Sequence, residues 1–380
     1  MDFDLTQDQM LLQTAVERLL GDEYGFEQRK RHMAEDGGWS RAMWAHYAEM
    51  GLLGLPFAEA DGGLGGGPVE TMIVMEAFGR HLVLEPYFAT VILAGGCLRI
   101  GASAEQRSAM VPKIADGSRL LAFAHVEAGA RFDLADVATR ARRDGGDWVL
   151  DGAKQYVLHG DCADQLIVSA RVSGGQRDRD GLALFLVDAG APGVSRRGYR
   201  TQDRLRAADV TFSGVRVPAA ALIGAAGAAL PVIERVVDIA IAALTAEQVG
   251  AMARVHEITV DYLKVRKQFG VLIGSFQALQ HRAVDMLVCV EQARSMAMFA
   301  TMMSTEADAL ERSRAMSAAK AQIGRAAKFV GEQAIQLHGG IGMTDECSAG
   351  HYYRRLTVAE FLFGDSAHHL AALARAGGLP

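Results

Sequence analysis

A change of pattern in the middle of the chain limits its fold more than any other feature. Between residues 121 and 227, short apolar runs such as 166–168 and 182–187 alternate with turns rich in Gly and Asp. Regularly spaced runs of this kind, with no helical pattern between them, predict strands. Neighbouring parallel strands need long crossover connections, which this region lacks, so the pattern indicates an antiparallel β domain and not a parallel nucleotide-binding sheet.

Segments of helical periodicity lie on both sides of this region. Thr6 with Gln9, and later Ser103 with Gln106, have the spacing of a capping box, which begins a helix. Towards the C-terminus, apolar residues recur at intervals of three and four, which predicts long helices that pack as a bundle. The two longest series are Phe276, Leu279, Ala283, Met286, Val290, Ala293, Ala297 and Ala300, and then Met316, Ala319, Ile323, Ala326 and Val330.

The fold class expected from this order is α+β, with three domains along the chain. Residues 1–120 are expected to form an N-terminal helical domain, 121–227 the middle β domain, and 228–380 a C-terminal four-helix bundle. A length of 380 residues exceeds what one hydrophobic core usually serves, and this also favours several packed domains.

Charge and cysteine content exclude several classes of protein. The net charge of −6 provides no basic surface for nucleic acid or for an anionic membrane. We expect no signal peptide, and no apolar run near the roughly 18 residues of a membrane span. Four scattered cysteines without a CxxC pair, and adjacent His368 and His369 without an HxxxH partner, indicate no metal site. A reducing cytoplasm is the expected location.

Two motifs in the C-terminal part carry specific information. Arg266-Lys-Gln-Phe-Gly270 is followed by Ser275-Phe-Gln-Ala-Leu-Gln-His281, and later comes Gln336-Leu-His-Gly-Gly-Ile-Gly342. These stretches resemble the R-x-x-F-G…F-Q-x-x-Q and Q-x-x-G-G-x-G segments of the acyl-CoA dehydrogenases. Further stretches similar to that family occur in the same order along nearly the whole chain, at 56–65, 151–154 and 209–218.

The resemblance implies a fold of helical, β-barrel-like and helical domains, assembled as a tetramer with FAD bound across a subunit interface. Arg266 would neutralise the pyrophosphate, since a guanidinium suits two phosphate oxygens. Gln336 would lie at the adenosine end, and Asp238 matches a residue of the family that contacts acyl-CoA. The cofactor-binding residues carried over are Arg266, Phe269, Gly270, Phe276, Gln277, Gln280, Gln336, Gly339 and Gly340.

The chain departs from the family at the catalytic base. The family removes a proton and a hydride from the α and β carbons of an acyl-CoA, with a Glu as base and the flavin as hydride acceptor. Phe363 stands at the usual Glu position, and Ala240 stands at the alternative position on an earlier helix. Glu247 and Asp365 are the remaining candidates for a base, and each is weighed against a purely structural carboxylate.

The positions that resemble the family's flavin-ring contacts are altered too. Val126, Phe132 and Leu158 replace three hydroxyl-bearing residues, so hydrogen bonds to the ring would be lost. Residues that would serve this subunit's own flavin and substrate are therefore changed, whereas those that would reach a neighbour's FAD are retained. This contrast resembles the base-lacking subunit of bacterial heteromeric acyl-CoA dehydrogenases.

The leading hypothesis is thus a flavin-dependent acyl-CoA dehydrogenase subunit that works in a heterotetramer with a homologous, base-containing subunit. An electron-transferring flavoprotein would accept the electrons, and the pathway would be β-oxidation of a fatty acid or a steroid side chain. The alternatives are a self-sufficient homotetramer with Glu247 or Asp365 as base, a non-catalytic protein that binds FAD or acyl-CoA, and a flavin oxidase or monooxygenase.

Overall fold

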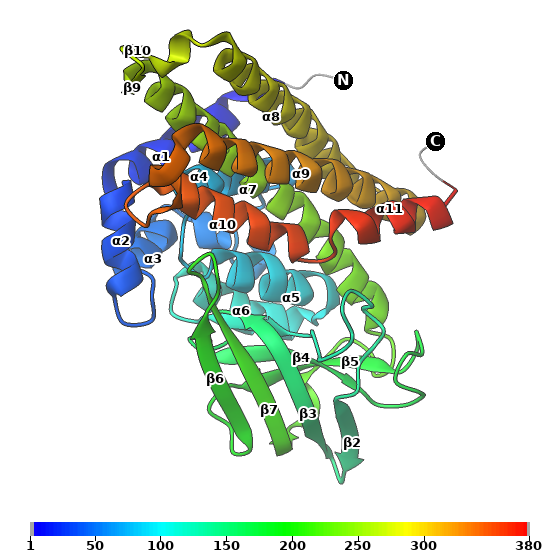
Figure 1. Ribbon diagram of the computed structural model, residues 1–380. Helices are drawn as coiled ribbons and strands as arrows, with labels where there is room; N and C mark the ends of the chain where they lie inside the picture. The colour runs from blue at the N-terminus through cyan, green and yellow to red at the C-terminus, as the bar shows by residue number, and fades with distance from the viewer. Residues whose placement is uncertain (1–3, 378–380) are drawn as a thin grey trace. The chain divides into compact units, whose positions relative to one another are not determined.

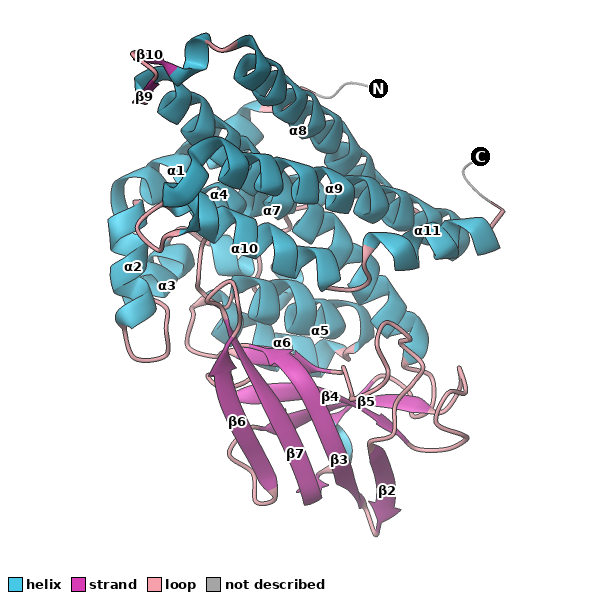
Figure 2. Cartoon of the chain, in the orientation of Figure 1, coloured by secondary structure: helices cyan, strands magenta, loops and turns pink. Residues whose placement is uncertain are grey.

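The computed structural model describes residues 4–377, in which helices come first, strands next and helices last (Figure 2). Both predicted capping boxes are confirmed, since the Thr6 hydroxyl accepts the Gln9 N–H and the Ser103 hydroxyl accepts the Gln106 N–H. The elements before the sheet are α1 (Gln7–Glu23), α2 (Phe26–Ala34), α3 (Arg41–Glu49), η1 (Leu52–Gly54), η2 (Glu59–Asp61), α4 (Pro68–His81), η3 (Phe88–Ala94), α5 (Gly95–Gly101) and α6 (Ala104–Ala115).

The chain divides into two compact units that do not follow the order of the sequence. Unit 1 comprises the described residues up to Arg31, the segment Pro68–Val83 and the residues from Ile241 onward. Unit 2 comprises His32–Gly67 and Leu84–Ala240. The helices that precede the sheet are therefore shared between two cores.

Unit 2 contains an eight-stranded sheet in the order β6-β7-β3-β2-β4-β5-β8, with β1 paired to β4 (Figure 1). Most pairs are antiparallel, as the spacing of the apolar runs predicts, but β1 and β2 each pair with β4 in parallel. The strands are β1 (Leu121–Ala124), β2 (Arg140–Asp144), β3 (Asp147–Leu158), β4 (Gln165–Arg171), β5 (Leu182–Asp188), β6 (Val194–Arg200), β7 (Arg206–Val217) and β8 (Leu222–Ile223).

Unit 1 is helical, and α9 lies at its centre in contact with α8, α10 and α11. The predicted apolar series are buried from Ala283 onward in α8 and throughout α9, because residues three and four apart share one face of a helix. Phe276 and Leu279 are the exceptions, since Phe276 precedes the helix and is 37% exposed, and Leu279, in the first turn, is half-buried. The remaining elements are α7 (Leu230–Val265), β9 (Lys267–Gln268), β10 (Val271–Leu272), η5 (Ile273–Ser275), α8 (Gln277–Met303), α9 (Ala309–His338), η6 (Gly339–Met343), α10 (Ser348–Phe361) and α11 (Ser366–Arg375), with the short η4 (Ala219–Ala221) before β8.

Helix α7 corrects the expectation that no segment is long and apolar enough to span a membrane. It has 36 residues and an 18-residue window of mean hydropathy 1.5, which satisfies a span by length and composition. However, 89% of that window is buried in the protein, as in the core helix of a soluble protein. In the sequence of α7, small and charged residues interrupt the large apolar ones, so no long uninterrupted apolar run is visible.

Helices α4 and α7 cross with their backbones in direct contact. A Cβ atom added to Gly79 of α4 would lie 1.8 Å from the Glu247 carbonyl oxygen, and one added to Gly250 of α7 would lie 1.9 Å from the Glu76 carbonyl oxygen. Each helix therefore presents a glycine to the other helix's backbone. Both carbonyls belong to helical hydrogen-bond ladders, so neither can move aside easily.

We expect Gly79→Ala or Gly250→Ala to lower the free energy of unfolding by roughly 1–3 kcal/mol or more, because the added methyl overpacks the crossing. Gly21→Ala in α1 is the matched control, since a Cβ added there meets no other part of the described chain within 4 Å beyond its own neighbours in the helix. That control should instead raise stability by up to about 1 kcal/mol through helix propensity. Urea unfolding of the three variants measures the difference, and equal effects would contradict the tight crossing.

Candidate cofactor site

The hairpin of β9 and β10 presents an aromatic side chain to solvent. Gln268 pairs with Val271, so Phe269 and Gly270 form a two-residue loop, and their φ angles are +53° and +79°. Positive φ at both positions is the geometry of a type I′ turn, which costs a non-glycine residue roughly 1–2 kcal/mol. Phe269 is nevertheless 91% exposed. A strained and exposed phenyl ring indicates a binding role more than a structural one.

Arg266 lies between α7 and this hairpin, exposed to solvent. Its backbone is fixed, because its N–H donates to the Tyr262 carbonyl and its carbonyl accepts the Ile273 N–H. Its guanidinium has no hydrogen bond or ion pair to any other described residue. This leaves an unneutralised cation three residues before the exposed Phe269, a combination suited to a phosphate next to a stacking base.

A ring stack joins this region to the end of α9. The rings of Tyr262 and His338 lie 4.6 Å apart at an angle of 23°. Gln336, two residues before His338, is exposed on the last turn of α9, and Gly339 and Gly340 follow it in η6, also exposed. Apart from its chain neighbours, no atom of the described residues lies within 4 Å of a Cβ added to either glycine, so their backbone is open to a ligand. The motif that begins at Arg266 and the motif that begins at Gln336 therefore lie on neighbouring parts of unit 1.

The remaining predicted cofactor residues lie at the start of α8. The rings of Phe276 and Phe269 meet edge to face at 6.2 Å. Gln280 is exposed and donates to the Gly274 carbonyl, while Gln277 is exposed as the first residue of the helix. This surface fits the pyrophosphate and adenosine end of FAD by its donors, aromatic rings and open backbone; the assignment itself stays a prediction.

The turn between α10 and α11 places a phenyl ring where the sequence comparison expects a base. Phe363 has a φ of +60° and Gly364 a φ of +115°, and the Phe363 carbonyl lies 3.1 Å from His369 Nε2. Below the turn, Lys320 donates to the Glu360 carbonyl, and Ser366 donates to the Glu360 carboxylate. These partly buried hydrogen bonds fix the turn. The phenyl ring of Phe363 cannot accept a proton.

Asp365, one of the two candidate bases, caps a helix. Its carboxylate accepts the His368 N–H at 2.8 Å at the start of α11. A carboxylate in this position satisfies one of the orphan donors of the helix. Helix capping thus accounts for the carboxylate of Asp365 without a catalytic role.

Glu247, the other candidate, forms a buried ion pair. Both of its carboxylate oxygens accept hydrogen bonds from Arg355 of α10, at 2.6 and 2.7 Å. Its side chain is almost fully buried. Removing one partner of a buried pair leaves an uncompensated charge, so this carboxylate is committed to Arg355. The role of Glu247 as a base stays a prediction, and its carboxylate is already paired with Arg355.

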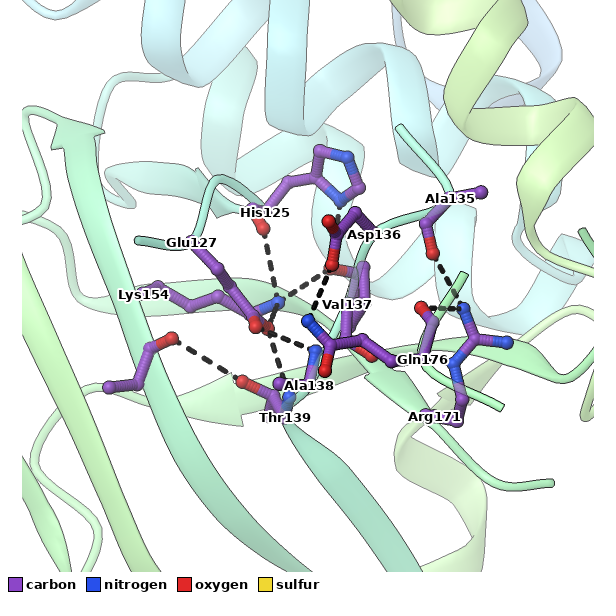
Figure 3. A network of polar contacts seen from close by, with 12 residues as sticks. His125, Glu127, Ala135, Asp136, Val137, Ala138, Thr139, Lys154, Arg171 and Gln176 are labelled. Carbon is purple, nitrogen blue, oxygen red and sulfur yellow. Dashed lines mark hydrogen bonds and ion pairs between the residues drawn. The ribbon is translucent and has the colours of Figure 1, made fainter. Parts of the chain in front are cut away.

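In unit 2, a buried polar network lies where the sequence resembles the flavin-ring loop (Figure 3). Lys154, fully buried, donates to the Glu127 carboxylate at 2.7 Å, to the Ser169 hydroxyl at 2.9 Å and to the His125 carbonyl at 3.1 Å. Glu127 also accepts the N–H groups of Ala138 and Thr139. Every donor of the ammonium thus has a partner within the chain, and none is left for a cofactor.

Charge and burial compete in this network. Burial lowers the pKa of Lys154 to about 8, against the attraction of Glu127. For Glu127, burial alone would raise the pKa, but Lys154 and the hydrogen bonds from Thr139 and Ala138 outweigh it and hold the pKa below its usual value. Lys154 lies in the stretch 151–154 that resembles the family and Glu127 follows Val126, but nothing in the sequence indicates that the two form a pair.

The predicted flavin-facing positions of unit 2 offer little to a ring. Val126 is 41% exposed, and Arg131, the neighbour of Phe132, is exposed with a φ of +48°. Tyr156, two residues before Leu158, has a φ of +53°, and its N–H donates to Asp209. Val126, Phe132 and Leu158 have no side-chain hydrogen-bonding group, so this loop fits the flavin ring poorly. Asp238 is 8% exposed and Ala240 is fully buried in the first part of α7.

No group of three or more His, Cys, Asp or Glu side chains among residues 4–377 is arranged to hold a metal ion. All four cysteines are free thiols.

Three family models cover nearly the whole chain. They are described as the N-terminal, middle and C-terminal domains of acyl-CoA dehydrogenases, and they match residues 6–118, 122–215 and 227–378. A relative, acyl-CoA dehydrogenase FadE12 from Mycobacterium tuberculosis, is 31% identical over 86% of this chain and 84% of its own length.

Solved structures share the fold. A variant of the Tcur3481-Tcur3483 steroid ACAD is 29% identical with a TM-score of 0.87, covering 97% of both chains. The ChsE4-ChsE5 complex from Mycobacterium tuberculosis is 25% identical with a TM-score of 0.88 over the full length of both chains. The structure of PigA with FAD and proline has a TM-score of 0.90 and 25% identity, over 99% of this chain and 98% of that chain.

Acid should destabilise the protein through two buried histidines. Burial, with Lys320 and His368 nearby, lowers the pKa of His369 to about 3, and burial with Lys154 does the same for His125. Both pKa values lie below that of an unfolded histidine, so the unfolded state binds more protons between about pH 6.5 and pH 3. The stability contributed by each neutral buried histidine is therefore complete above about pH 6.5. As the pH falls below this value, the free energy of unfolding decreases by about 1.4 kcal/mol per pH unit for each histidine.

Urea unfolding of unmodified protein and of His369→Gln between pH 7 and pH 5 measures this slope. The variant should lose less stability on acidification than the unmodified protein, whatever its stability at pH 7. His46→Gln, at an exposed position of α3, is the control and should keep the original slope. Identical slopes in all three proteins would contradict a buried neutral His369.

Proposed function

The chain is a member of the acyl-CoA dehydrogenase family, whose enzymes are FAD-dependent oxidoreductases. From this premise we propose that it is a base-lacking subunit of a hetero-oligomeric acyl-CoA dehydrogenase and completes the cofactor site of a homologous partner. The observation that carries the proposal is a contrast. The surface around Arg266 and Phe269 is exposed and open to a ligand, whereas the positions of the base hold Phe363 and Ala240.

The role of this chain would be to bind one end of a cofactor. FAD, when bound, supplies the hydride acceptor of the reaction. Arg266 would hold the pyrophosphate by charge-assisted hydrogen bonds, since its guanidinium has no other partner among the described residues. Phe269 and Phe276 would offer rings for stacking, and the exposed Gly339 and Gly340 would let the backbone come close to the adenosine end.

Proton abstraction would fall to the partner subunit. A general base must lie within hydrogen-bonding reach of the proton that it removes and must be able to accept it. Phe363 and Ala240 cannot do so, Asp365 caps α11, and Glu247 would first have to leave Arg355. We therefore do not propose a self-sufficient enzyme with Glu247 as base.

Relatives support a two-component assembly. Two similar structures, Tcur3481-Tcur3483 and the ChsE4-ChsE5 complex, each have two named components. We extend this to a tetramer in which this chain pairs with a homologue that retains the Glu. We also propose an acyl-CoA substrate from fatty acid or steroid side-chain β-oxidation, an electron-transferring flavoprotein as electron acceptor, and a cytoplasmic location.

The visible absorption spectrum tests the assembly directly. The chain purified alone should be colourless, and the chain co-expressed with a base-containing homologue should carry about one FAD per two subunits. FAD in every subunit of the chain purified alone would overturn the proposal, because its own pocket would then hold a flavin despite Val126, Phe132 and Leu158.

Arg266→Ala should weaken FAD binding in the assembled complex by about 10- to 100-fold, the expected effect of losing a hydrogen bond to a charged group. Folding should be unaffected, because the side chain is exposed. Lys264→Ala is the matched control, since Lys264 lies two residues before Arg266 in the last turn of α7 and its ammonium pairs with Asp261. Equal FAD affinity in the Arg266 variant and the control would place the pyrophosphate elsewhere.

A further inference from the structure

A buried arginine near the N-terminus reaches the C-terminal helices of unit 1. Arg29 of α2 is only 3% exposed, although arginine is seldom buried without partners. Its Nε donates to the Leu82 carbonyl at 2.7 Å, and its Nη1 lies 3.3 Å from Nδ1 of His351 on α10. Neither Arg29 nor His351 belongs to the motifs found in the sequence, and neither has a role in the proposed function.

The partners of His351 determine its tautomer. Its Nε2 lies 3.2 Å from the Asp345 carbonyl, which can only accept, so Nε2 carries the hydrogen. Its Nδ1 must then accept from Arg29, because a guanidinium can only donate. Burial lowers the pKa of His351, and the positive charges of Arg29 and Arg354 lower it further, against the hydrogen bond to Asp345. The ring is therefore neutral, and Phe26 packs against it edge to face at 5.0 Å.

This ring fixes the loop that follows η6. Besides the bond from His351, Asp345 accepts from Arg354 at 2.6 Å through its carboxylate. Thr344 donates twice to the Ile341 carbonyl, from its N–H at 3.0 Å and from its hydroxyl at 2.9 Å. Residues 341–345 are thus held at one end by the bonds from Thr344 to Ile341, and at the other end by the bonds from α10 to Asp345.

The first two glycines of the turn have no packing contact of this kind. Gly339 and Gly340 are exposed and, apart from their chain neighbours, no atom of the described residues lies within 4 Å of a Cβ added to either. Gly342, by contrast, contacts α10, since a Cβ added to Gly350 would lie 3.0 Å from the Gly342 carbonyl oxygen. The position of the exposed glycines therefore depends on α9 before them and on the anchored residues 341–345 after them.

We infer that Arg29, His351, Asp345 and Arg354 position the glycine turn Gly339–Met343 so that this chain can close the adenosine end of its partner's cofactor site. The inference rests on the proposed function, which makes this turn part of a shared FAD site. It adds positioning residues that do not touch the cofactor. Arg29 acts from α2 through the ring of His351, which bonds to the Asp345 carbonyl, and Arg354 acts through the Asp345 carboxylate.

The test compares two neighbouring substitutions on α10 in the co-expressed complex. His351→Leu removes the bonds to both Arg29 and Asp345. Tyr352→Phe is the matched control, because Tyr352 is equally buried and its hydroxyl donates to the Arg80 carbonyl, away from the turn. The readouts are the FAD dissociation constant, the size of the assembled complex and the midpoint of thermal unfolding.

His351→Leu should raise the FAD dissociation constant about tenfold or more while the complex keeps its size. Tyr352→Phe should lower the unfolding midpoint but leave FAD affinity unchanged. His351→Gln, which retains one donor and one acceptor, should recover most of the affinity. If both α10 variants bind FAD as tightly as the unmodified complex, or if both weaken it equally, the positioning role is wrong.

Arg354→Gln provides a second test that does not disturb the buried core, since Arg354 is partly exposed. It should weaken FAD binding several-fold, and unchanged affinity would count against the inference. Hydrogen exchange at the amides of residues 341–345 separates this inference from the proposed function. Faster exchange in His351→Leu than in Tyr352→Phe is expected even if the unmodified complex binds no FAD, a result that would refute only the proposed function.

Discussion

Unit 1 depends on the contact between the backbones of α4 and α7 at Gly79 and Gly250. Because each glycine meets a carbonyl of the other helix, the crossing has a single tight geometry. The two helices are further joined where Arg80 of α4 forms a bidentate ion pair with Glu257 of α7. The crossing also includes the backbone of Glu247, so it sets where that carboxylate emerges and meets Arg355. The commitment of Glu247 to a structural ion pair follows from this packing.

Exposed groups of the kinds that could bind a cofactor are divided unequally between the two units. Unit 1 presents Arg266, Phe269 and the glycines of η6 on its surface, where their charge, ring and backbone are available. In unit 2, by contrast, the ammonium of Lys154 is satisfied by Glu127, Ser169 and His125 within the chain. A chain with this division can lend groups to another site more readily than it can complete its own. The proposed heteromeric function is the simplest use of such a division.

Much of the fold could be predicted because burial follows regular spacing. The intervals of three and four identified the buried faces of α8 and α9, and the capping boxes marked the first residues of α1 and α6. The parallel pairing of β1 and β2 with β4 was not predicted, since it joins segments distant in sequence. For the same reason the sequence did not show that two units share the N-terminal helices, or that Arg29 would contact a ring 322 residues away.

The sequence by itself determined the order of helical and β regions, the motifs that resemble a cofactor-binding surface and the absence of a carboxylate at positions 363 and 240. These properties depend on residue type and local spacing, which one chain displays directly. Only the tertiary structure decided that Glu247 is paired with Arg355, that Asp365 caps a helix, and that the Arg266 guanidinium is left without a partner among the described residues. Whether a charged group is available for chemistry depends on its neighbours in space, and packing brings those neighbours from distant parts of the chain.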